Sequence, residues 1–251
     1  MFMRHKYSLQ LTWIFLILLT AVFFGCSGTN GGSADGKLNG LHKYYYPEGQ
    51  LYLEVHYKDS IAHGITKQYF KNGQLFEEVN YVNGAKHGIQ KRYYEDGALS
   101  METPYDSGRR HGIERKFRKD GTKAYEAPYH YDNACIGLKE YYLSGNPVEK
   151  YPEIIITPED RLFDNFRYSL RISLSEKHKV EFFEGTLTQG KYVSADAEKI
   201  YMENSSTARI DYPLGPGEFL MKTINVIAKV KTELGNTYIT QKKYNLAVEN
   251  R

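Results

Sequence analysis

The side chains best suited to catalysis or metal binding recur at one fixed spacing. His63, His87 and His111 stand 24 residues apart, and Cys135 occupies the next place in the series. Imidazole and thiolate groups bind Zn²⁺ and also serve as bases and nucleophiles. If the copies lie on every second strand of a sheet, neighbouring copies are roughly 9–10 Å apart. Since Zn–N bonds are only about 2.0–2.1 Å long, the series predicts no shared metal, and the same distance argues against a Cys135–His111 nucleophile pair.

Cys135 is instead expected in a loop between repeats, without a catalytic role. Cys26 is the only other cysteine, so if Cys26 is modified no intramolecular disulfide can form and paired-cysteine metal sites are excluded. Replacement of Cys135 by Ser should then leave folding nearly unchanged. The sequence predicts no cofactor, no metal and no enzymatic activity.

The spacing of 24 residues extends well beyond these side chains. A fixed period of this length is the signature of a repeat architecture. Five copies in register predict a repeat array over residues 40–151. The repeating positions are Gly49, Gly73, Gly97, Gly121 and Gly145; Gly40, Gly64, Gly88 and Gly112, with Ile136 in the fifth place; Tyr57, Tyr81, Tyr105 and Tyr129; and Tyr45, Tyr69, Tyr93, Phe117 and Tyr141.

Each unit has the pattern of a β-hairpin followed by a connecting loop. In one unit, residues 65–70 and 75–81 favour strands, and Asn72-Gly73 lies between them. Asn-Gly predicts a two-residue type I′ turn, which needs positive φ at both central positions. Asn83-Gly84 then turns the chain toward the next unit. The expected fold is a β-meander in which each hairpin contacts chiefly its neighbours.

Two columns of charge follow the same period. With a two-residue turn, Lys67 faces Glu78 and Lys91 faces Glu102 across their hairpins. We favour a set of cross-strand ion pairs, each contributing about 0.2–1 kcal/mol; the alternative is a charged groove for an anionic glycan. The columns are Lys43, Lys67, Lys91, Arg115 and Lys139, and Glu54, Glu78, Glu102 and Glu126.

Tyrosines are concentrated in the repeats. Residues 44–151 hold 16 of the 23 Tyr, several of them in adjacent pairs. Adjacent strand residues point to opposite faces, so each pair places an aromatic ring on both sides of the sheet. Tyr suits such half-wet positions and is also common in binding surfaces. The predicted binding surface for a protein or an envelope glycan consists of Tyr45, Tyr69, Tyr93, Tyr141, Lys67 and Lys91.

The N-terminus has the organisation of an export signal. Arg4 and Lys6 precede an apolar stretch over residues 11–24, which is shorter than the roughly 20 residues that span a bilayer. Small Gly25 and then Cys26 follow, before an abrupt change to polar residues. This arrangement resembles the bacterial lipoprotein signal. An uncleaved membrane anchor and an ordinary secretory peptide are the alternatives.

The resemblance implies a specific processing of the chain. Residues 1–25 would be removed, and Cys26 would become the new N-terminus and carry on its thiol a diacylglycerol with fatty acids such as palmitate. Residues 26–39, rich in Gly, Ser and Asn, would form a flexible tether. Because no acidic residue precedes Asp35, the resemblance to sorted lipoproteins implies an outer-membrane location.

The repeats also resemble a known family. Units of the form Gly-Ile-x-Lys-x-Tyr-Tyr-x-x-Gly-x-Leu, ending in Tyr-x-x-Gly, are similar to the bacterial variant of the MORN repeat, often called the YwqK-like antitoxin family. The variant is common in exported and lipidated proteins. A literal antitoxin role would require a toxin that reaches the periplasm, since an inhibitor of a cytoplasmic toxin has no use behind an export signal.

After Pro152 the period disappears and a second all-β segment follows. About seven strands in residues 152–251 predict a small sandwich of immunoglobulin or fibronectin type III style, with a long final hairpin after Pro216. The expected strands cover residues 154–156, 166–174, 180–183, 199–202, 208–212, 224–230 and 238–246.

Charge and composition limit the function. The chain has 33 Lys and Arg against 30 Asp and Glu, which argues against a nucleic-acid binder. We therefore expect an all-β, membrane-anchored, non-enzymatic binding or scaffold module. The alternatives are an inhibitor of an exported toxin and a glycan-acting accessory or enzyme.

Overall fold

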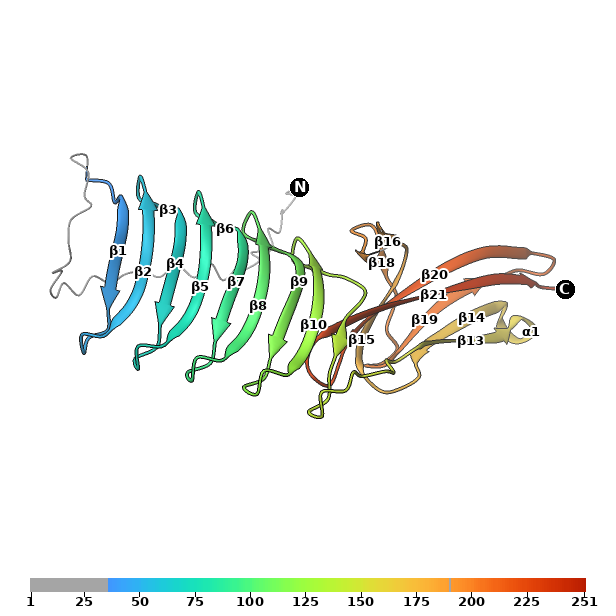
Figure 1. Cartoon of the computed structure of the whole chain (residues 1–251). Coiled ribbons are helices and arrows are strands. Elements are labelled where there is room, and N and C mark those ends of the chain that lie inside the picture. Colours follow the sequence, from blue (N-terminus) through green and yellow to red (C-terminus); the bar gives the residue numbers. More distant parts are fainter. Residues whose placement is uncertain (1–35, 190) are drawn as a thin grey trace. The chain divides into compact units, whose positions relative to one another are not determined.

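The computed structural model describes residues 36–189 and 191–251, and its regular structure is almost entirely β-strand (Figure 1), as predicted. Cys26, the predicted signal segment and most of the predicted tether lie outside the described residues. Within the described part of the chain, no helix is long and apolar enough to span a bilayer.

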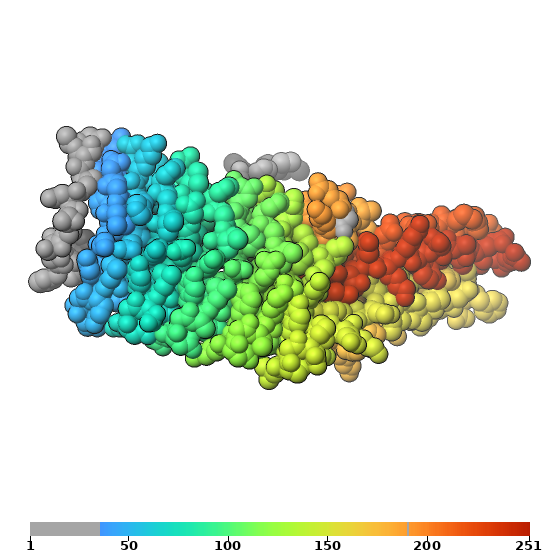
Figure 2. Space-filling view, in the orientation of Figure 1, coloured from blue at the N-terminus to red at the C-terminus, as the bar shows by residue number. Residues whose placement is uncertain are grey.

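The repeats form one antiparallel meander. Its 12-stranded sheet has the order β1-β2-β4-β5-β7-β8-β9-β10-β11, with β3, β6 and β12 as short additions. Successive repeats follow one another along the sheet (Figure 2). The strands are β1 (Gly40–Tyr45), β2 (Leu51–Lys58), β3 (Ile61–Ala62), β4 (Gly64–Tyr69), β5 (Leu75–Val82), β6 (Ala85–Lys86), β7 (Gly88–Tyr93), β8 (Leu99–Asp106), β9 (Arg109–Phe117), β10 (Lys123–His130), β11 (Asn133–Ala134) and β12 (Lys139–Glu140).

The turns inside the hairpins differ from the prediction. Gly73 N–H donates to the carbonyl of Phe70 at 2.9 Å, and Phe70 N–H donates to the carbonyl of Gln74 at 2.8 Å. The loop therefore has three residues, and of these only Gly73 has a positive φ, of 84°. This is the geometry of a type I turn followed by a left-handed glycine, so the two-residue type I′ prediction was wrong here.

A β-bulge next to the turn restores the expected register. Tyr69 lies opposite Leu75, whereas Gln68 lies opposite Glu77, which leaves Phe76 as one extra residue on β5. The longer loop shifts the pairing by one residue and the bulge shifts it back. The same shift occurs beside the turns of the β1–β2, β7–β8 and β9–β10 hairpins.

Type I′ turns occur instead at the opposite ends of the strands, in the loops that connect one repeat to the next. Asn83 and Gly84 have φ values of 49° and 79° and connect the paired residues Val82 and Ala85. Shortly afterwards the chain passes through Gly88, which belongs to the repeating series Gly40, Gly64, Gly88 and Gly112. Its φ is 82°, a conformation that L side chains rarely adopt. The series that contains Gly88 is therefore a backbone requirement, since its other three glycines also have positive φ.

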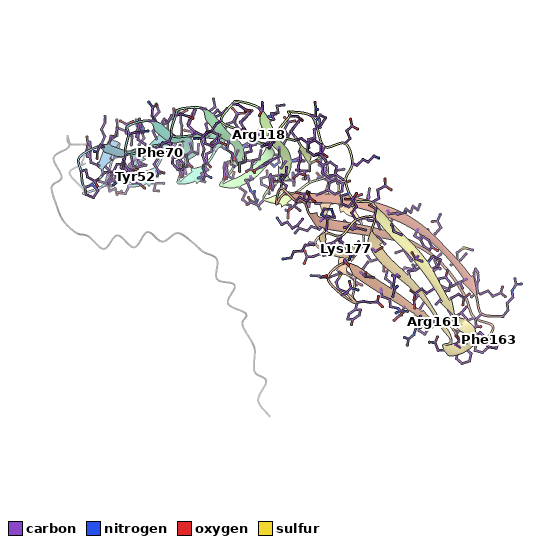
Figure 3. The ribbon with its side chains drawn as sticks, turned by 90° about the horizontal axis from the view of Figure 1, so that it is seen from below. Tyr52, Phe70, Arg118, Arg161, Phe163 and Lys177 are labelled. Atoms are coloured by element: carbon purple, nitrogen blue, oxygen red, sulfur yellow. The ribbon has the colours of Figure 1, made fainter. Side chains whose placement is uncertain are left out.

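Neighbouring hairpins are linked by side chains that recur at the repeat spacing. The Tyr46 hydroxyl donates to the carbonyl of Tyr69 at 2.9 Å, and the Tyr94 hydroxyl donates to the carbonyl of Phe117 at 2.8 Å. Arg118 takes the same place in the fourth hairpin and donates to the carbonyl of Tyr141 (Figure 3). Tyr46, Tyr94 and Arg118 thus link neighbouring hairpins.

The C-terminal strands form a two-sheet sandwich. One sheet has the order β13-β14-β19 and the other β18-β15-β20-β21, with the small β16–β17 pair alongside. This division of strands in chain order is that of the predicted immunoglobulin or fibronectin style. The elements are β13 (Ile154–Arg161), α1 (Leu162–Asn165), β14 (Arg167–Leu174), β15 (Lys179–Glu184), β16 (Leu187–Thr188), β17 (Tyr192–Val193), β18 (Glu198–Lys199), β19 (Thr207–Pro213), β20 (Phe219–Lys231) and β21 (Thr237–Glu249).

The sandwich encloses the main apolar core. Leu170 and Ile172 from one sheet meet Phe182 and Ile224 from the other, all with no exposed surface. The strand expected over residues 199–202 was largely wrong, because β18 covers only Glu198–Lys199 and Met202 forms just an isolated bridge to Ala208. The one-turn helix α1 was not predicted.

Polar and aromatic contacts join the last repeat to the sandwich. Glu140 is only 3% exposed. Its Oε1 accepts hydrogen bonds from Thr232 Oγ1 and Asn236 Nδ2, both at 2.7 Å. The ring of Tyr151 stacks on Tyr238 with 4.5 Å between centroids. The junction is therefore built from specific side chains.

Candidate binding faces of the repeat sheet

The charge columns merge into one continuous row. As predicted, Lys67 faces Glu78 and Lys91 faces Glu102 within their hairpins. Pairing between hairpins adds that Glu78 also faces Lys91, and Glu102 also faces Arg115. The row, here called the charge ladder, alternates in sign across the sheet: Lys43, Glu54, Lys67, Glu78, Lys91, Glu102, Arg115, Glu126 and Lys139.

Contacts within the ladder vary in length. Lys43 Nζ lies 2.9 Å from Glu54 and Lys67 Nζ lies 3.6 Å from Glu78. Arg115 Nε donates to Glu126 at 3.2 Å. The hydrogen bond from Lys43 lowers the pKa of Glu54. The lowered pKa favours the charged form of Glu54.

The predicted tyrosines lie on the same face as the ladder, because each is two residues from a ladder cation on its strand. The Tyr69 hydroxyl donates to Glu54 at 2.8 Å, and the Tyr141 hydroxyl donates to Glu126 at 2.8 Å. Burial, followed by the bond to Glu54, raises the pKa of Tyr69 to about 12. Tyr45 is 51% exposed, whereas Tyr93 is half-buried.

The geometry brings all six predicted binding residues onto this ladder face. Lys67 and Lys91 belong to the charge ladder itself, and Tyr45, Tyr69, Tyr93 and Tyr141 form a parallel row beside it. Two of the hydroxyls are committed to ladder carboxylates, so these tyrosines offer mainly their rings to a partner.

An exposed apolar row on this face escaped the sequence analysis. Leu41, Ile65, Ile89 and Ile113 are each two residues before a ladder cation and are 40–54% exposed. Their spacing of 24 residues was the available signal. Such residues gain little from folding when they stay in water, and a repeated apolar row is typical of an interaction surface.

The opposite face of the sheet, here called the hollow face, is more enclosed. Gln90, Thr103 and Glu114 form part of a buried row that also contains Val55, Val79 and Ala127. Glu114 accepts hydrogen bonds from Thr103 Oγ1 and from the Tyr125 hydroxyl, both at 3.0 Å. Burial, together with the charge of Glu114, raises the pKa of Tyr125.

Two long cations cover part of the hollow face. Lys86 Nζ lies 5.1 Å from the centre of the Tyr105 ring and donates to Gln90 Oε1 at 3.0 Å. One unit later, the Arg110 guanidinium lies 3.8 Å from the centre of the Tyr129 ring. The cations shield these rings and polar groups from water.

The histidine and cysteine column does not converge on one site. His63 Nδ1 accepts from Asn83 N–H at 3.4 Å, and His87 Nδ1 lies 3.7 Å from Asp106. The ring of His111 packs instead against His130, with 4.9 Å between centroids. Within residues 36–189 and 191–251, no three His, Cys, Asp or Glu side chains are grouped to hold a metal ion.

Cys135 lies between β11 and β12, in a loop as predicted, but it is buried. Its exposure is 5% and its Sγ points to the carbonyl of Asn133 at 3.6 Å. Burial raises the pKa of the thiol. Burial therefore favours the protonated thiol, and because the site is buried, the expectation that Ser would be tolerated freely must be revised.

Comparison with known proteins identifies the repeats. The family model described as MORN repeat variant matches residues 38–59, 62–83 and 86–107. No curated protein matches the chain. Repeats of this family are generally non-catalytic and serve in binding, which indicates a repeat-based binding module. The matched segments run from β1 to β8 and carry most of both faces described above.

Proposed function

We propose that this chain is a lipid-anchored binding module of a bacterial cell envelope, which holds a protein partner on the ladder face. The anchor would be the lipid on Cys26, the location would be the outer membrane, and residues 26–39 would separate the module from the bilayer. The MORN repeat variant supports a binding role, and the signal-like N-terminus supports export.

The observation that carries the proposal is the exposed apolar row beside the charge ladder. Leu41, Ile65, Ile89 and Ile113 present aliphatic surface at regular intervals along one side of the ladder, and the row of tyrosine rings lies along its other side. Interface centres are commonly apolar and rimmed by polar groups. The ladder would then set the register of the partner, since misplaced like charges repel.

A protein partner fits this face better than a glycan. Aliphatic side chains offer a sugar polymer no hydrogen bonds, and the ladder carboxylates and ammonium groups already engage one another. A polypeptide can cover the Ile row with its own apolar side chains. The face is therefore suited to a strand, helix or loop of another protein.

The binding face can be tested by site-specific photo-crosslinking in the native envelope. A photoreactive residue at Ile113 should capture the partner, whereas the same residue at Lys116 should not. Both positions are exposed and lie on β9, but they face opposite sides of the sheet. Equal capture at the two positions, or capture at Lys116 alone, would contradict the assignment of the face.

The anchor can be tested separately from the face. In the native host, Cys26→Ala should block incorporation of labelled palmitate and leave a slower-migrating precursor. Retention of the label in the variant would show that Cys26 is not the lipidated residue. Fractionation with the inner membrane would contradict the outer-membrane location while leaving the anchor in place.

A further inference from the structure

The hollow face contains a depression of about 280 Å³ near its N-terminal end. The wall contains the rings of Tyr57 and Tyr81 with apolar side chains between them, and Thr66, Gln68 and Glu77 provide polar groups. The volume is below the roughly 300–1,000 Å³ of pockets for small molecules. It suits a single long side chain better than a cofactor.

Comparison with the next two repeat units shows which side chain the depression lacks. Lys86 covers Tyr105 and donates to Gln90, and Arg110 covers Tyr129 beside Glu114 one unit later. One unit earlier, Ala62 occupies the position of Lys86. Tyr81 and Thr66 likewise occupy the positions of Tyr105 and Gln90, the two residues that Lys86 contacts. The depression therefore lies where two neighbouring units place the chain's own cation.

The groups that a cation would contact are present and unengaged. In the described part of the chain, no Lys or Arg lies over the ring of Tyr81, in contrast to Tyr105 and Tyr129. The hydroxyl oxygen of Thr66 is buried and has no hydrogen-bond partner. An N–H donor entering the depression would satisfy this oxygen, and its charge would face an aromatic ring.

Glu77 contributes to the wall without favouring an anion. Its carboxylate pairs with Arg92 Nε at 2.7 Å, lies 3.9 Å from Lys86 Nζ and accepts a hydrogen bond from Gln90. Among the residues that line the depression, Glu77 alone is acidic. An anionic guest would meet its charge and the π face of Tyr81, both of which repel negative groups.

We propose that this depression, which is lined by Tyr81, Thr66 and Ala62, receives a lysine or arginine side chain of a partner polypeptide. The guest takes the position that Lys86 and Arg110 fill in the next two units. The site lies on the face opposite the Ile row, so it is a second contact that does not depend on the proposed function of the ladder face.

The proposal can be tested by NMR on the chain without its signal segment, with labelled methyl and aromatic groups. The probe is N-acetyl-arginine methylamide, and N-acetyl-citrulline methylamide is its neutral counterpart. The arginine probe should shift the signals of the Tyr81 ring and the Thr66 methyl group several-fold more than those of Tyr105 and Tyr129. The citrulline probe should shift them little.

Variants of the repeat provide matched controls. Ala62→Lys should fill the depression from within and abolish the shifts at Tyr81, whereas Asn80→Lys adds the same charge on the opposite face and should preserve them. Lys86→Ala should open a second depression and produce new shifts at Tyr105. If Ala62→Lys does not fold, Ala62→Met fills the same space without a charge and should give the same loss.

Three results would overturn the proposal. The first is an equal response to the citrulline probe, which would show that the depression does not select a cation. The second is an even response of all the hollow-face tyrosines, which would indicate non-specific association. The third is unchanged binding in Ala62→Lys or Ala62→Met, which would place the probe elsewhere.

Discussion

The repeat sheet and the sandwich bury their side chains in different ways. In the sandwich, two sheets face each other, and side chains such as Leu170, Phe182 and Ile224 are completely buried between them. Along the repeat hairpins, the buried side chains form a single row on the hollow face, where polar Gln90, Thr103 and Glu114 stand in line with apolar residues.

The difference indicates where stability and recognition reside. A sandwich core unites strands that are distant in the sequence, so damage at one point affects the whole domain. The units of a repeat array contact mainly their neighbours, and their energies are approximately additive. One face of the sheet can therefore remain exposed for a partner, while the sandwich contacts the last repeat through Glu140 and Tyr151.

The largest expected effect is in the sandwich core. Phe182→Ala removes a ring with no exposed surface and should lower the free energy of unfolding by about 3–5 kcal/mol. Val79→Ala, at the best-buried place in the repeats, should cost only about 2 kcal/mol because it removes two methyl groups. Denaturant unfolding followed by circular dichroism measures both. Equal costs would contradict the distinction between a shared core and local contacts.

The next effect concerns the junction that joins the two regions. Glu140→Ala leaves the donors of Thr232 and Asn236 without their acceptor in a buried place and should cost about 1–3 kcal/mol. It should also separate the unfolding of the repeats from that of the sandwich. Glu140→Gln keeps one acceptor oxygen and serves as the conservative control. An unchanged single transition in Glu140→Ala would show that Glu140 does not couple the regions.

A smaller effect is expected in the charge ladder, where continuity changes the outcome of a charge swap. Lys91→Glu places like charges beside both Glu78 and Glu102. An isolated pair would recover on adding Glu102→Lys. In the ladder, however, the double variant still leaves Glu78 beside an acid, and it places a lysine beside Arg115.

The double variant should therefore be about as stable as either single variant, and more stable than the sum of the two costs. Each ladder contact contributes well under about 1 kcal/mol because it is partly exposed. A thermodynamic cycle at low salt measures these terms. Full recovery to the wild-type stability would indicate isolated pairs, and strict additivity would indicate that the columns do not interact.

Much of the repeat could be predicted because the period constrains it. The spacing of 24 residues fixes which residues share a face, and Lys67 opposite Glu78 followed from the sequence alone. The turn type did not, because Asn-Gly suits both a two-residue turn and the last two places of a three-residue loop. The error left the register intact only because the bulge at Phe76 compensates for it.

The binding features were harder to predict for a different reason. The partners within each hairpin followed from the repeat, but the contacts between hairpins depend on a change of register after the outer turn, where Lys86 lies opposite Tyr81 but Arg92 lies opposite Glu77. Those contacts create the continuous ladder. The depression beside Ala62 arises because this place in the repeat holds an alanine where the next two units hold Lys86 and Arg110, and its meaning emerges only when Lys86 is seen over Tyr105. The burial of Cys135 likewise comes from tertiary packing.

The smallest expected effect is a pH dependence of the charge ladder. The pKa of Glu54 is lowered, first by the hydrogen bond from Lys43, and that of Glu126 is lowered, first by the hydrogen bond from Tyr141. A carboxyl whose pKa is lower in the folded state stabilises the fold above its unfolded pKa, which is ordinarily 4.5. This contribution is lost as the pH falls through the folded value.

The variant Glu54→Gln/Glu126→Gln should consequently be less stable than the wild type at pH 7, and the difference should shrink below about pH 4 as the wild-type carboxyls become protonated. Each site should contribute no more than about 1 kcal/mol. Urea midpoints at pH 7 and pH 3 measure the change, with Val79→Ala as a control whose cost does not depend on these carboxyls. A difference that is the same at both pH values would mean that the two glutamates stabilise the sheet by packing alone. The ladder charges could then serve electrostatic recognition without contributing to the stability of the fold.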